Sequence, residues 1–282
     1  MMLRLGTALM LITLACTPAT VAGAAAVPVT KVLVIVEENH SLSQMRTGMP
    51  YLYSQALRYG YATHYTAVAH PSLPNYLAIA SGSTFGITDD KPPSVHSISP
   101  VSIFSAASAK SYEESMPTNC RLTDAYPYAV KHNPLAYVRA ARAKCSTNDV
   151  PAGTASAGIL HNDLARGTLP AVGFVVPNLR NDAHDGTLAT ADAWLKAWLA
   201  RVYVSPDWKA GRLAVIVTAD EDAYNQGNTV LTAVLAPSQT HHVVTTALTH
   251  YSLTGFLTKV EHVACLRNAC TAPSFAKAFG LP

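Results

Sequence analysis

The chain has 282 residues, of which 49% are hydrophobic, 13% charged and 8% aromatic. This composition excludes collagen, coiled coil and intrinsic disorder, and the length suits a single α/β domain. Lys and Arg number 20 against 17 Asp and Glu, a net charge of +3 without a basic run, which argues against a nucleic-acid partner. The 11 His residues are the unusual feature, because His titrates near neutral pH and ligates metals.

Residues 1–26 have the pattern of a secretory signal peptide. Arg4 supplies the positive charge, an apolar run follows, and small residues at 21–26 provide a cleavage stretch. The apolar run is too short for a spanning helix. Cys16 raises the alternative of a lipid anchor, which is weaker because Thr13 stands where an aliphatic residue is usual. We therefore expect a secreted protein, with residues 27–282 forming one domain that has no transmembrane segment.

The remaining cysteines suggest two disulfides, since their number is even and the chain is predicted to be exported. Proximity favours Cys120 with Cys145 and Cys265 with Cys270, although three pairings are open. A four-cysteine zinc site is the alternative, disfavoured by the lack of a C-x₂-C pair.

Short apolar runs rich in Val, Ile or Leu alternate with helical patterns along the chain. The runs predict buried strands at 31–36, 171–176, 212–218 and 230–236, and the helices are expected at 50–59, 188–202 and 250–263. This alternation predicts a layered α/β fold with helices on both faces of a sheet. Residues 91–100, rich in Pro and Ser, are expected to form a surface loop.

Polar clusters follow three of these strands, at 37–41, 177–186 and 219–222. An open α/β sheet binds its ligands at the carboxyl ends of the strands. Adjacent carboxylates and amides supply the hard oxygen ligands that a divalent cation requires. Any one cluster alone would be interpreted as a helix-capping loop, but three at equivalent positions indicate a metal site.

Residues 67–82 predict a helix that begins beside a serine. Ser72 is expected to be the N-cap, Pro74 to lie in the first turn and Gly82 to end the helix. Free N–H groups at such a helix end bind anions such as phosphate. Ser72 is either a simple cap or a nucleophile, and the second role needs a base or a metal to activate its hydroxyl.

Taken together, blocks at 34–41, 70–78, 128–134, 177–186, 192–195, 217–222 and 249–252 resemble a known family. The chain is similar to the phosphoesterases of the alkaline phosphatase superfamily, in the branch of bacterial acid phosphatases and phospholipases C. The resemblance implies a three-layer α/β/α sandwich with a central, mostly parallel sheet.

The resemblance also implies the site residues. A divalent metal, either Mg, Ca, Mn, Zn or Fe, would be held by Glu38, Asn39, Asp220, Glu221 and Ser72. Asn75 would bind a phosphoryl oxygen, His132 and His184 would contact the phosphate, and Asp182 and His250 would lie behind them. Leu73, Ala183 and Ala219 depart from residues common in relatives, which leaves substrate choice open.

These residues predict a secreted, metal-dependent phosphatase that hydrolyses phosphate monoesters through a phosphoserine on Ser72. A protonated His132 or His184 would donate to the leaving alcohol. A phospholipid or phosphoinositide head group is a candidate substrate. The alternatives are a phospholipase C-type phosphodiesterase and, in another class, a non-catalytic exported binding protein, which would not need Ser72. A carboxylesterase is disfavoured because G-x-S-x-G is absent from the sequence.

Overall fold

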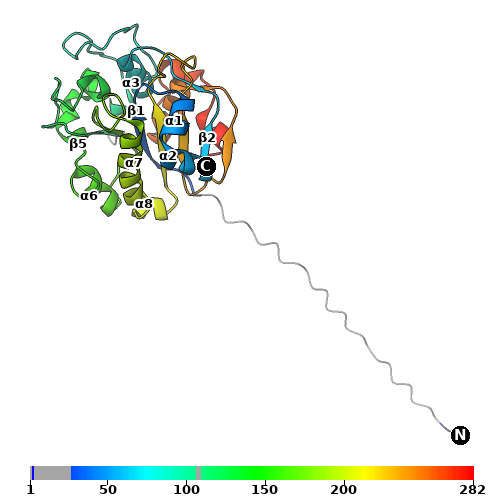
Figure 1. Ribbon diagram of the computed structural model, residues 1–282. Coiled ribbons are helices and arrows are strands. Elements are labelled where there is room, and N and C mark those ends of the chain that lie inside the picture. Colours follow the sequence, from blue (N-terminus) through cyan, green and yellow to red (C-terminus); the bar gives the residue numbers. More distant parts are fainter. Residues whose placement is uncertain (1, 3–26, 106–108) are drawn as a thin grey trace.

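The computed structural model describes residues 2, 27–105 and 109–282 (Figure 1). The predicted signal peptide, Cys16 included, lies outside the described residues apart from Met2. Within the described part of the chain, no helix combines the length and apolar character needed to cross a membrane. The buried apolar side chains form one hydrophobic core, which is built around a central sheet.

The central sheet has eight strands in the order β5-β4-β6-β1-β7-β8-β2-β9. Every neighbouring pair is parallel except β7 with β8 and β8 with β2. A second, two-stranded parallel sheet pairs β10 with β3. The strands are β1 (Lys31–Glu37), β2 (Gly60–Ala62), β3 (Tyr65–Thr66), β4 (Ala109–Glu113), β5 (Asp149–Pro151), β6 (Val172–Val176), β7 (Leu213–Ala219), β8 (Thr232–Leu235), β9 (His242–Val244) and β10 (Leu248–Thr249).

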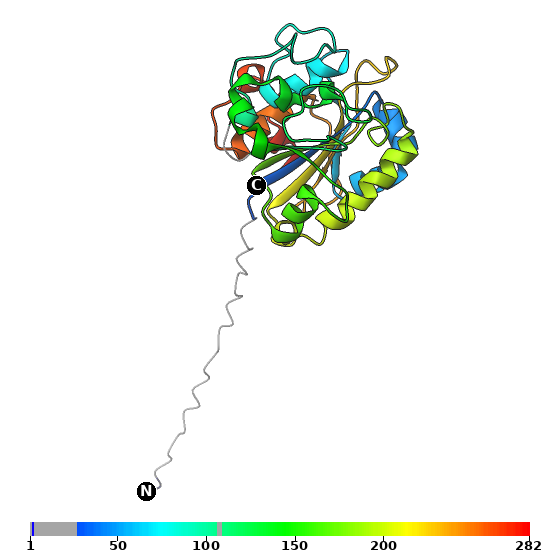
Figure 2. The same cartoon turned by 90° about the vertical axis from the view of Figure 1, so that its left-hand side faces the viewer.

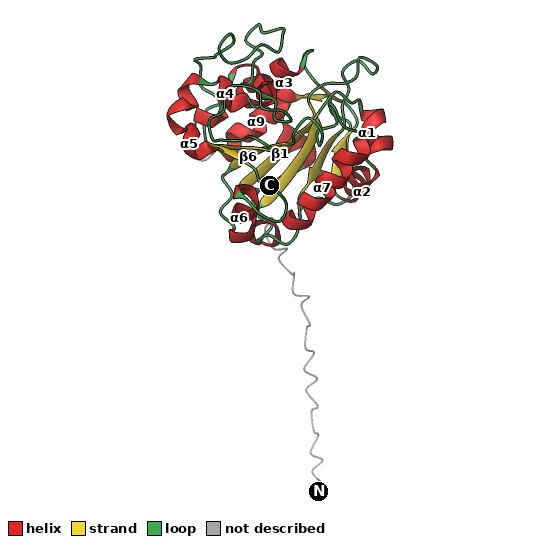
Figure 3. Cartoon of the chain, turned by 60° about the vertical axis from the view of Figure 1, so that its left-hand side comes forward, coloured by secondary structure: helices red, strands yellow, loops and turns green. Residues whose placement is uncertain are grey.

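Helices cover both faces of the sheet, as the views in Figures 2 and 3 show. One layer contains α1, α2, α6, α7 and α8, and the other contains α3, α4, α9 and α10. The helices are α1 (Leu42–Gly48), α2 (Pro50–Arg58), α3 (Ser72–Ser81), α4 (Pro134–Tyr137), α5 (Cys145–Asn148), α6 (Ile159–Arg166), α7 (Leu188–Val202), α8 (Pro206–Lys209), α9 (His250–Val260) and α10 (Phe275–Phe279). The predicted three-layer α/β/α sandwich with a mostly parallel sheet is therefore confirmed.

The predicted strands are the core strands β1, β6, β7 and β8, and the predicted helices are α2, α7 and α9. The bounds agree within two residues except at α9, which ends at Val260 rather than at residue 263. The chain leaves this helix through a turn in which His262 has a positive φ of 54°. Residues 91–100 form a loop, as expected.

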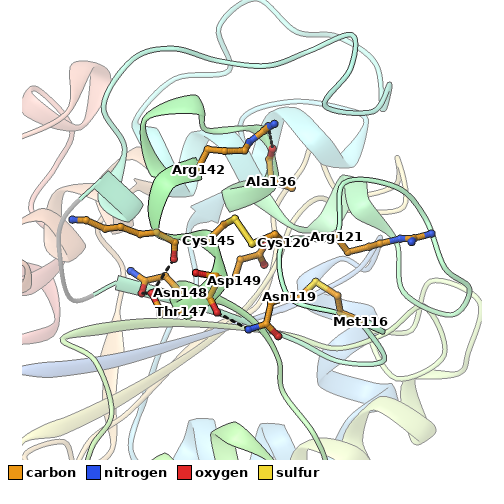
Figure 4. Close-up of a disulfide and its surroundings, with 12 residues drawn as sticks. Met116, Asn119, Cys120, Arg121, Ala136, Arg142, Cys145, Thr147, Asn148 and Asp149 are labelled. Atoms are coloured by element: carbon orange, nitrogen blue, oxygen red, sulfur yellow. Dashed lines mark hydrogen bonds between the residues drawn. A yellow bond between two sulfur atoms is a disulfide. The ribbon is translucent and has the colours of Figure 1, made fainter.

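Two disulfides join the cysteines that are nearest in sequence, Cys120 with Cys145 and Cys265 with Cys270. The favoured pairing is thus confirmed, and the zinc alternative is wrong because the thiols are bonded to one another. Figure 4 shows the first disulfide beside Asp149, at the start of β5. It ties the loop of residues 114–129, through Cys120, to the short helix α5.

Candidate active site

The three predicted polar clusters meet at one edge of the sheet. They follow β1, β6 and β7, which are adjacent and parallel, so their carboxyl ends point the same way. Helix α3 lies near this edge in Figure 1. The site is therefore assembled from strand ends and one helix start.

Ser72 is the first residue of α3, and its buried hydroxyl donates to Glu38 Oε2 at 3.0 Å. The expectation that Ser72 is the N-cap is wrong: Pro71 holds that position, in extended backbone. One turn further along α3, the Tyr76 hydroxyl donates to Glu38 Oε1 at 2.6 Å. Both oxygens of Glu38 thus accept from the same face of one helix, since residues four apart are neighbours there.

Asp220 and Glu221 follow β7 directly and are both buried. Asp220 Oδ1 accepts from the backbone N–H groups of Asn39 and Glu221. Asn39 adopts a left-handed φ of 56°, which Asn tolerates better than most residues. Asp220 Oδ2 is buried and has no hydrogen-bond partner among the described residues.

Burial, reinforced by Glu38, raises the pKa of Asp220 well above its usual value and that of Glu221 to about 8. The site therefore holds more carboxylate than its own cations neutralise. A divalent cation would relieve this repulsion and would give Asp220 Oδ2 a partner, so the donor set fits such an ion.

His132 is buried between two carboxylates. Its Nε2 lies 3.2 Å from Glu38 Oε1 and its Nδ1 lies 3.3 Å from Asp182 Oδ2. Burial opposes the protonated ring, but the two acids outweigh it and raise the pKa of His132 to about 10. Burial alone would raise the pKa of Glu38, but the charge and hydrogen bond of His132 outweigh burial and lower this pKa to about 2. The His132 ring also stacks on Tyr76, with 5.1 Å between the ring centroids.

Glu38, His132 and Asp182 also place ligand atoms within 4.8 Å of one another, close enough to share a metal ion. This triad shares only Glu38 with the ligand set that the sequence predicts. A ring that faces a carboxylate at each nitrogen is better described as an imidazolium that positions Glu38.

His184 lies at the outer side of this group, 28% exposed. Lys131 Nζ lies 3.2 Å from His184 Nε2, and an ammonium can only donate, so this nitrogen is the acceptor. Nδ1–H then donates to Asp185 Oδ1 at 2.8 Å. Lys131 also donates to Asp90 Oδ2 at 3.1 Å.

Asn75 is buried one turn after Ser72 and stands beside the acids. Its Oδ1 accepts from Val68 N and Ala69 N, and its Nδ2 donates to Glu221 Oε2 at 3.2 Å. These bonds hold the loop before α3 against Glu221. His70 in that loop lies 3.2 Å from the same Glu221 oxygen and stacks on Tyr224.

His250 begins α9 and lies behind Asp220, completely buried. Burial lowers its pKa to about 4, so the ring is neutral. Its Nε2–H donates to the Asp220 carbonyl at 2.7 Å, which leaves Nδ1 to accept from the Tyr65 hydroxyl. His250 therefore positions the end of β7.

The structure thus brings together the predicted residues Glu38, Ser72, Asn75, His132, Asp182, His184, Asp220 and Glu221, with Asn39 present through its backbone. Three further residues, Tyr76, Lys131 and Asp90, were missed. Tyr76 was detectable because it lies four residues after Ser72 on a predicted helix. Asp90 was not, since it lies in an ordinary polar loop, yet it accepts from Leu73 N at 2.9 Å and so takes an amide expected to be free for phosphate.

Comparison with known proteins finds a matching family model and relatives that are named as phosphatases. The model of the Phosphoesterase family matches residues 44–264. A phosphate-repressible acid phosphatase of Penicillium chrysogenum is 29% identical over 211 residues, which is 69% of this chain and 50% of that protein. A phosphatidylinositol-3-phosphatase of Mycobacterium tuberculosis is 27% identical over 257 residues, 88% of this chain and 82% of that one. The chain therefore spans half the length of the fungal relative.

Solved structures agree on the fold. A protein of the alkaline phosphatase superfamily from Vibrio parahaemolyticus superimposes with a TM-score of 0.56 at 12% identity, covering 89% of this chain and 73% of that one. Murine ectonucleotide pyrophosphatase/phosphodiesterase 5 superimposes with a TM-score of 0.52 at 10% identity, covering 89% of this chain and 99% of that one.

Proposed function

Because the chain belongs to the Phosphoesterase family, we propose that it is a metal-dependent phosphatase that hydrolyses phosphate monoesters through a phosphoserine on Ser72. The observation that carries the proposal is the contact between the Ser72 hydroxyl and Glu38 at the start of α3. Glu38 is also near enough to Asp220 to raise its pKa, and Asp220 Oδ2 has no hydrogen-bond partner among the described residues. A mere binding protein would not need a serine in that position.

The metal site of the proposal consists of residues around Ser72. The ligands would be Glu38, Asn39, Ser72, Asp220 and Glu221. The ion would be a divalent Mg, Ca, Mn, Zn or Fe. When bound, such an ion supplies positive charge that lowers the pKa of the serine hydroxyl and neutralises the phosphate. Asn75 and His250 position Glu221 and Asp220 from behind.

In the first step, a bond forms between Ser72 Oγ and phosphorus as the bond from phosphorus to the leaving oxygen breaks. The serine proton leaves toward Glu38 Oε2, which already accepts its hydrogen bond. The leaving alkoxide takes a proton from the Lys131–His184 pair, because His132 contacts a carboxylate at both nitrogens. A water oxygen then bonds to phosphorus as the bond from phosphorus to Ser72 Oγ breaks, and inorganic phosphate is released. The water gives a proton to the Lys131–His184 pair, and Glu38 returns its proton to Ser72 Oγ, so all groups regain their starting state.

Turnover of p-nitrophenyl phosphate and of its bis(p-nitrophenyl) diester, with and without chelator, tests the proposal. We expect the monoester to be the better substrate, chelator to abolish turnover, and Ser72→Ala to lower kcat by about 10³-fold or more. An acid-quenched reaction should carry one phosphoryl group on Ser72 by peptide mass spectrometry. Faster diester turnover would instead favour a phospholipase C-type phosphodiesterase.

Ser81→Ala is the matched control, because Ser81 is a buried serine at the other end of the same helix and its hydroxyl has no hydrogen-bond partner in the described structure. It should retain wild-type turnover. Full activity in Ser72→Ala would remove the nucleophile assignment. Because one relative is named a phosphatidylinositol-3-phosphatase, the assay should also include vesicles that contain phosphatidylinositol 3-phosphate.

The proposal includes export, for which the two disulfides are the supporting observation, since disulfides persist in oxidising compartments. N-terminal sequencing of the protein from culture medium should begin near Val27. A lipid-modified chain that begins at Cys16 would contradict free secretion.

A further inference from the structure

A cavity of about 310 Å³ opens beside the candidate active site. Six of its lining residues carry the argument: Asp90, Asp124, Tyr126, Tyr128, Lys131 and His184. Its volume lies at the lower end of the range for small-molecule sites, about 300–1,000 Å³, which suits a single ring. The proposed reaction does not use most of this lining.

The cavity adjoins the position of the reacting phosphate. Its wall residue Asp90 accepts from the N–H of Leu73, the residue after Ser72. Two other wall residues, Lys131 and His184, form the pair assigned to protonate the leaving oxygen. A group attached to the phosphate through that oxygen therefore extends into this cavity.

The lining combines an aromatic surface with hydrogen-bond acceptors. Tyr126 is 60% exposed, and the Arg180 guanidinium lies 5.2 Å from the centre of its ring. An exposed aromatic ring offers a flat apolar surface on which the C–H groups of a substrate ring can pack. The carboxylates of Asp90 and Asp124 are acceptors only, so they suit hydroxyl donors.

The charge of the lining disfavours a second anion. Asp90 already pairs with Lys131, the only Lys or Arg among the residues lining the cavity. The Asp124 carboxylate accepts from Val130 N through Oδ1, and no cation pairs with it among the described residues. Two cations lie nearby: Arg180, at the Tyr126 ring, interacts with Asp185, and Arg121 donates to the backbone carbonyl of Asp124 rather than to its carboxylate. A second phosphate would therefore meet the Asp124 carboxylate, and like charges in contact oppose binding.

We propose that this cavity is the leaving-group subsite and that it takes a hydroxyl-rich ring that carries no second phosphate. Phosphatidylinositol 3-phosphate, whose ring also carries a phosphodiester, should then be a poorer substrate than a ring monophosphate. The inference rests on the proposed phosphatase function and adds the class of alcohol that it releases. Asp124 and Tyr126 are its specificity-determining residues.

The test compares kcat/KM for glucose 6-phosphate and glucose 1,6-bisphosphate, with p-nitrophenyl phosphate as the reference. We expect the monophosphate to be favoured by about tenfold, a preference that like-charge repulsion can supply and that salt should weaken. Asp124→Asn retains the acceptor for Val130 N but removes the charge, and should narrow the preference about threefold because Asp124 is exposed. Tyr126→Leu should raise KM for glucose 6-phosphate more than for p-nitrophenyl phosphate.

Asp163→Asn is the matched control. Asp163 lies on α6, accepts from Lys110 and Tyr112, and does not line the cavity. It should leave the preference unchanged. Equal kcat/KM for the two sugar phosphates, or the same result for Asp124→Asn and Asp163→Asn, would overturn the subsite while leaving the phosphatase intact. Failure of the wild type to turn over any phosphomonoester would overturn both proposals.

Discussion

The two sides of the candidate site differ in how firmly their residues are held. On the nucleophile side, Ser72, Glu38 and Asp220 are at most 1% exposed, and hydrogen bonds hold the Ser72 hydroxyl, both Glu38 oxygens and Asp220 Oδ1. On the cavity side, Tyr126 is 60% exposed and Asp124 lies in an exposed loop. The buried side suits chemistry, which needs fixed charges in a low dielectric, and the open side suits selection among substrates.

The comparison makes an energetic prediction. Charges on the buried side interact strongly, because little water screens them, whereas those on the cavity side are screened. Substitutions that remove a charge on the nucleophile side should therefore lower kcat/KM for every substrate by a large factor, while substitutions on the cavity side should change only the choice of substrate.

Asp220→Asn should have the largest effect. The amide retains an oxygen to accept from Asn39 N and Glu221 N but removes one charge from the proposed ligand set. We expect a loss of bound metal by elemental analysis and a fall in kcat/KM of about 10³-fold. Asp192→Asn is the control, since this largely buried acid accepts from the start of α2 and lies outside the ligand set. If the Asp220→Asn protein kept its full metal content, Asp220 would not be a metal ligand, and the proposed difference between the two sides would be wrong.

Asp149→Asn tests whether burial alone makes an acid catalytic. Burial raises the pKa of Asp149 to about 7. The pKa of Glu113, a neighbouring acid, is also raised, by burial and by the charge of Asp149. Because the folded pKa is raised, the folded state loses stability as pH rises from about 4 to about 7, by at most about 4 kcal/mol. In urea unfolding, the free energy of unfolding of the variant should fall less steeply with pH across that range than that of the wild type. The kcat of the variant should be unchanged. A steeper loss would contradict this sign.

Removal of the Cys120–Cys145 disulfide, by changing both residues to Ser, should destabilise the protein. The bond closes a loop of 25 residues that carries Tyr126 and Lys131. Chain entropy predicts a loss of free energy of unfolding of about 3.5 kcal/mol, against about 2 kcal/mol for the five-residue loop of Cys265–Cys270. KM for glucose 6-phosphate should rise only in the first variant. A rise in both would mean that the loop does not control the cavity.

Tyr76→Phe should have the smallest effect. It removes one hydrogen bond to the Glu38 carboxylate but leaves the ring stacked on His132. A hydrogen bond to a charged group contributes about 1.5 kcal/mol or more, so kcat/KM should fall about tenfold. Tyr112→Phe is the control, because the Tyr112 hydroxyl donates to Asp163, outside the candidate site. This variant should retain activity. Equal activity in both variants would mean that Tyr76 does not position Glu38.

Apolar runs made the middle of the sheet predictable, while its edges were not. The strands β1, β6 and β7 are buried on both faces and therefore have nearly continuous apolar sequences. The sequence of β4 reads AKSYE, and only the fold supplies Asp163 of α6 as the partner of Lys110 and of the Tyr112 hydroxyl. No periodic pattern marks such a strand.

The layered fold and the acids that follow the central strands were predictable from short stretches of sequence, and proximity along the chain favoured the two disulfides that form. These features are local, because each depends on a short run of residues and its period. Three features could not be predicted in this way: Asp90 accepts from the amide of Leu73, His132 lies between two carboxylates, and a cavity lies beside Lys131. These are contacts between segments distant in sequence, and the packing of the layers brings them together.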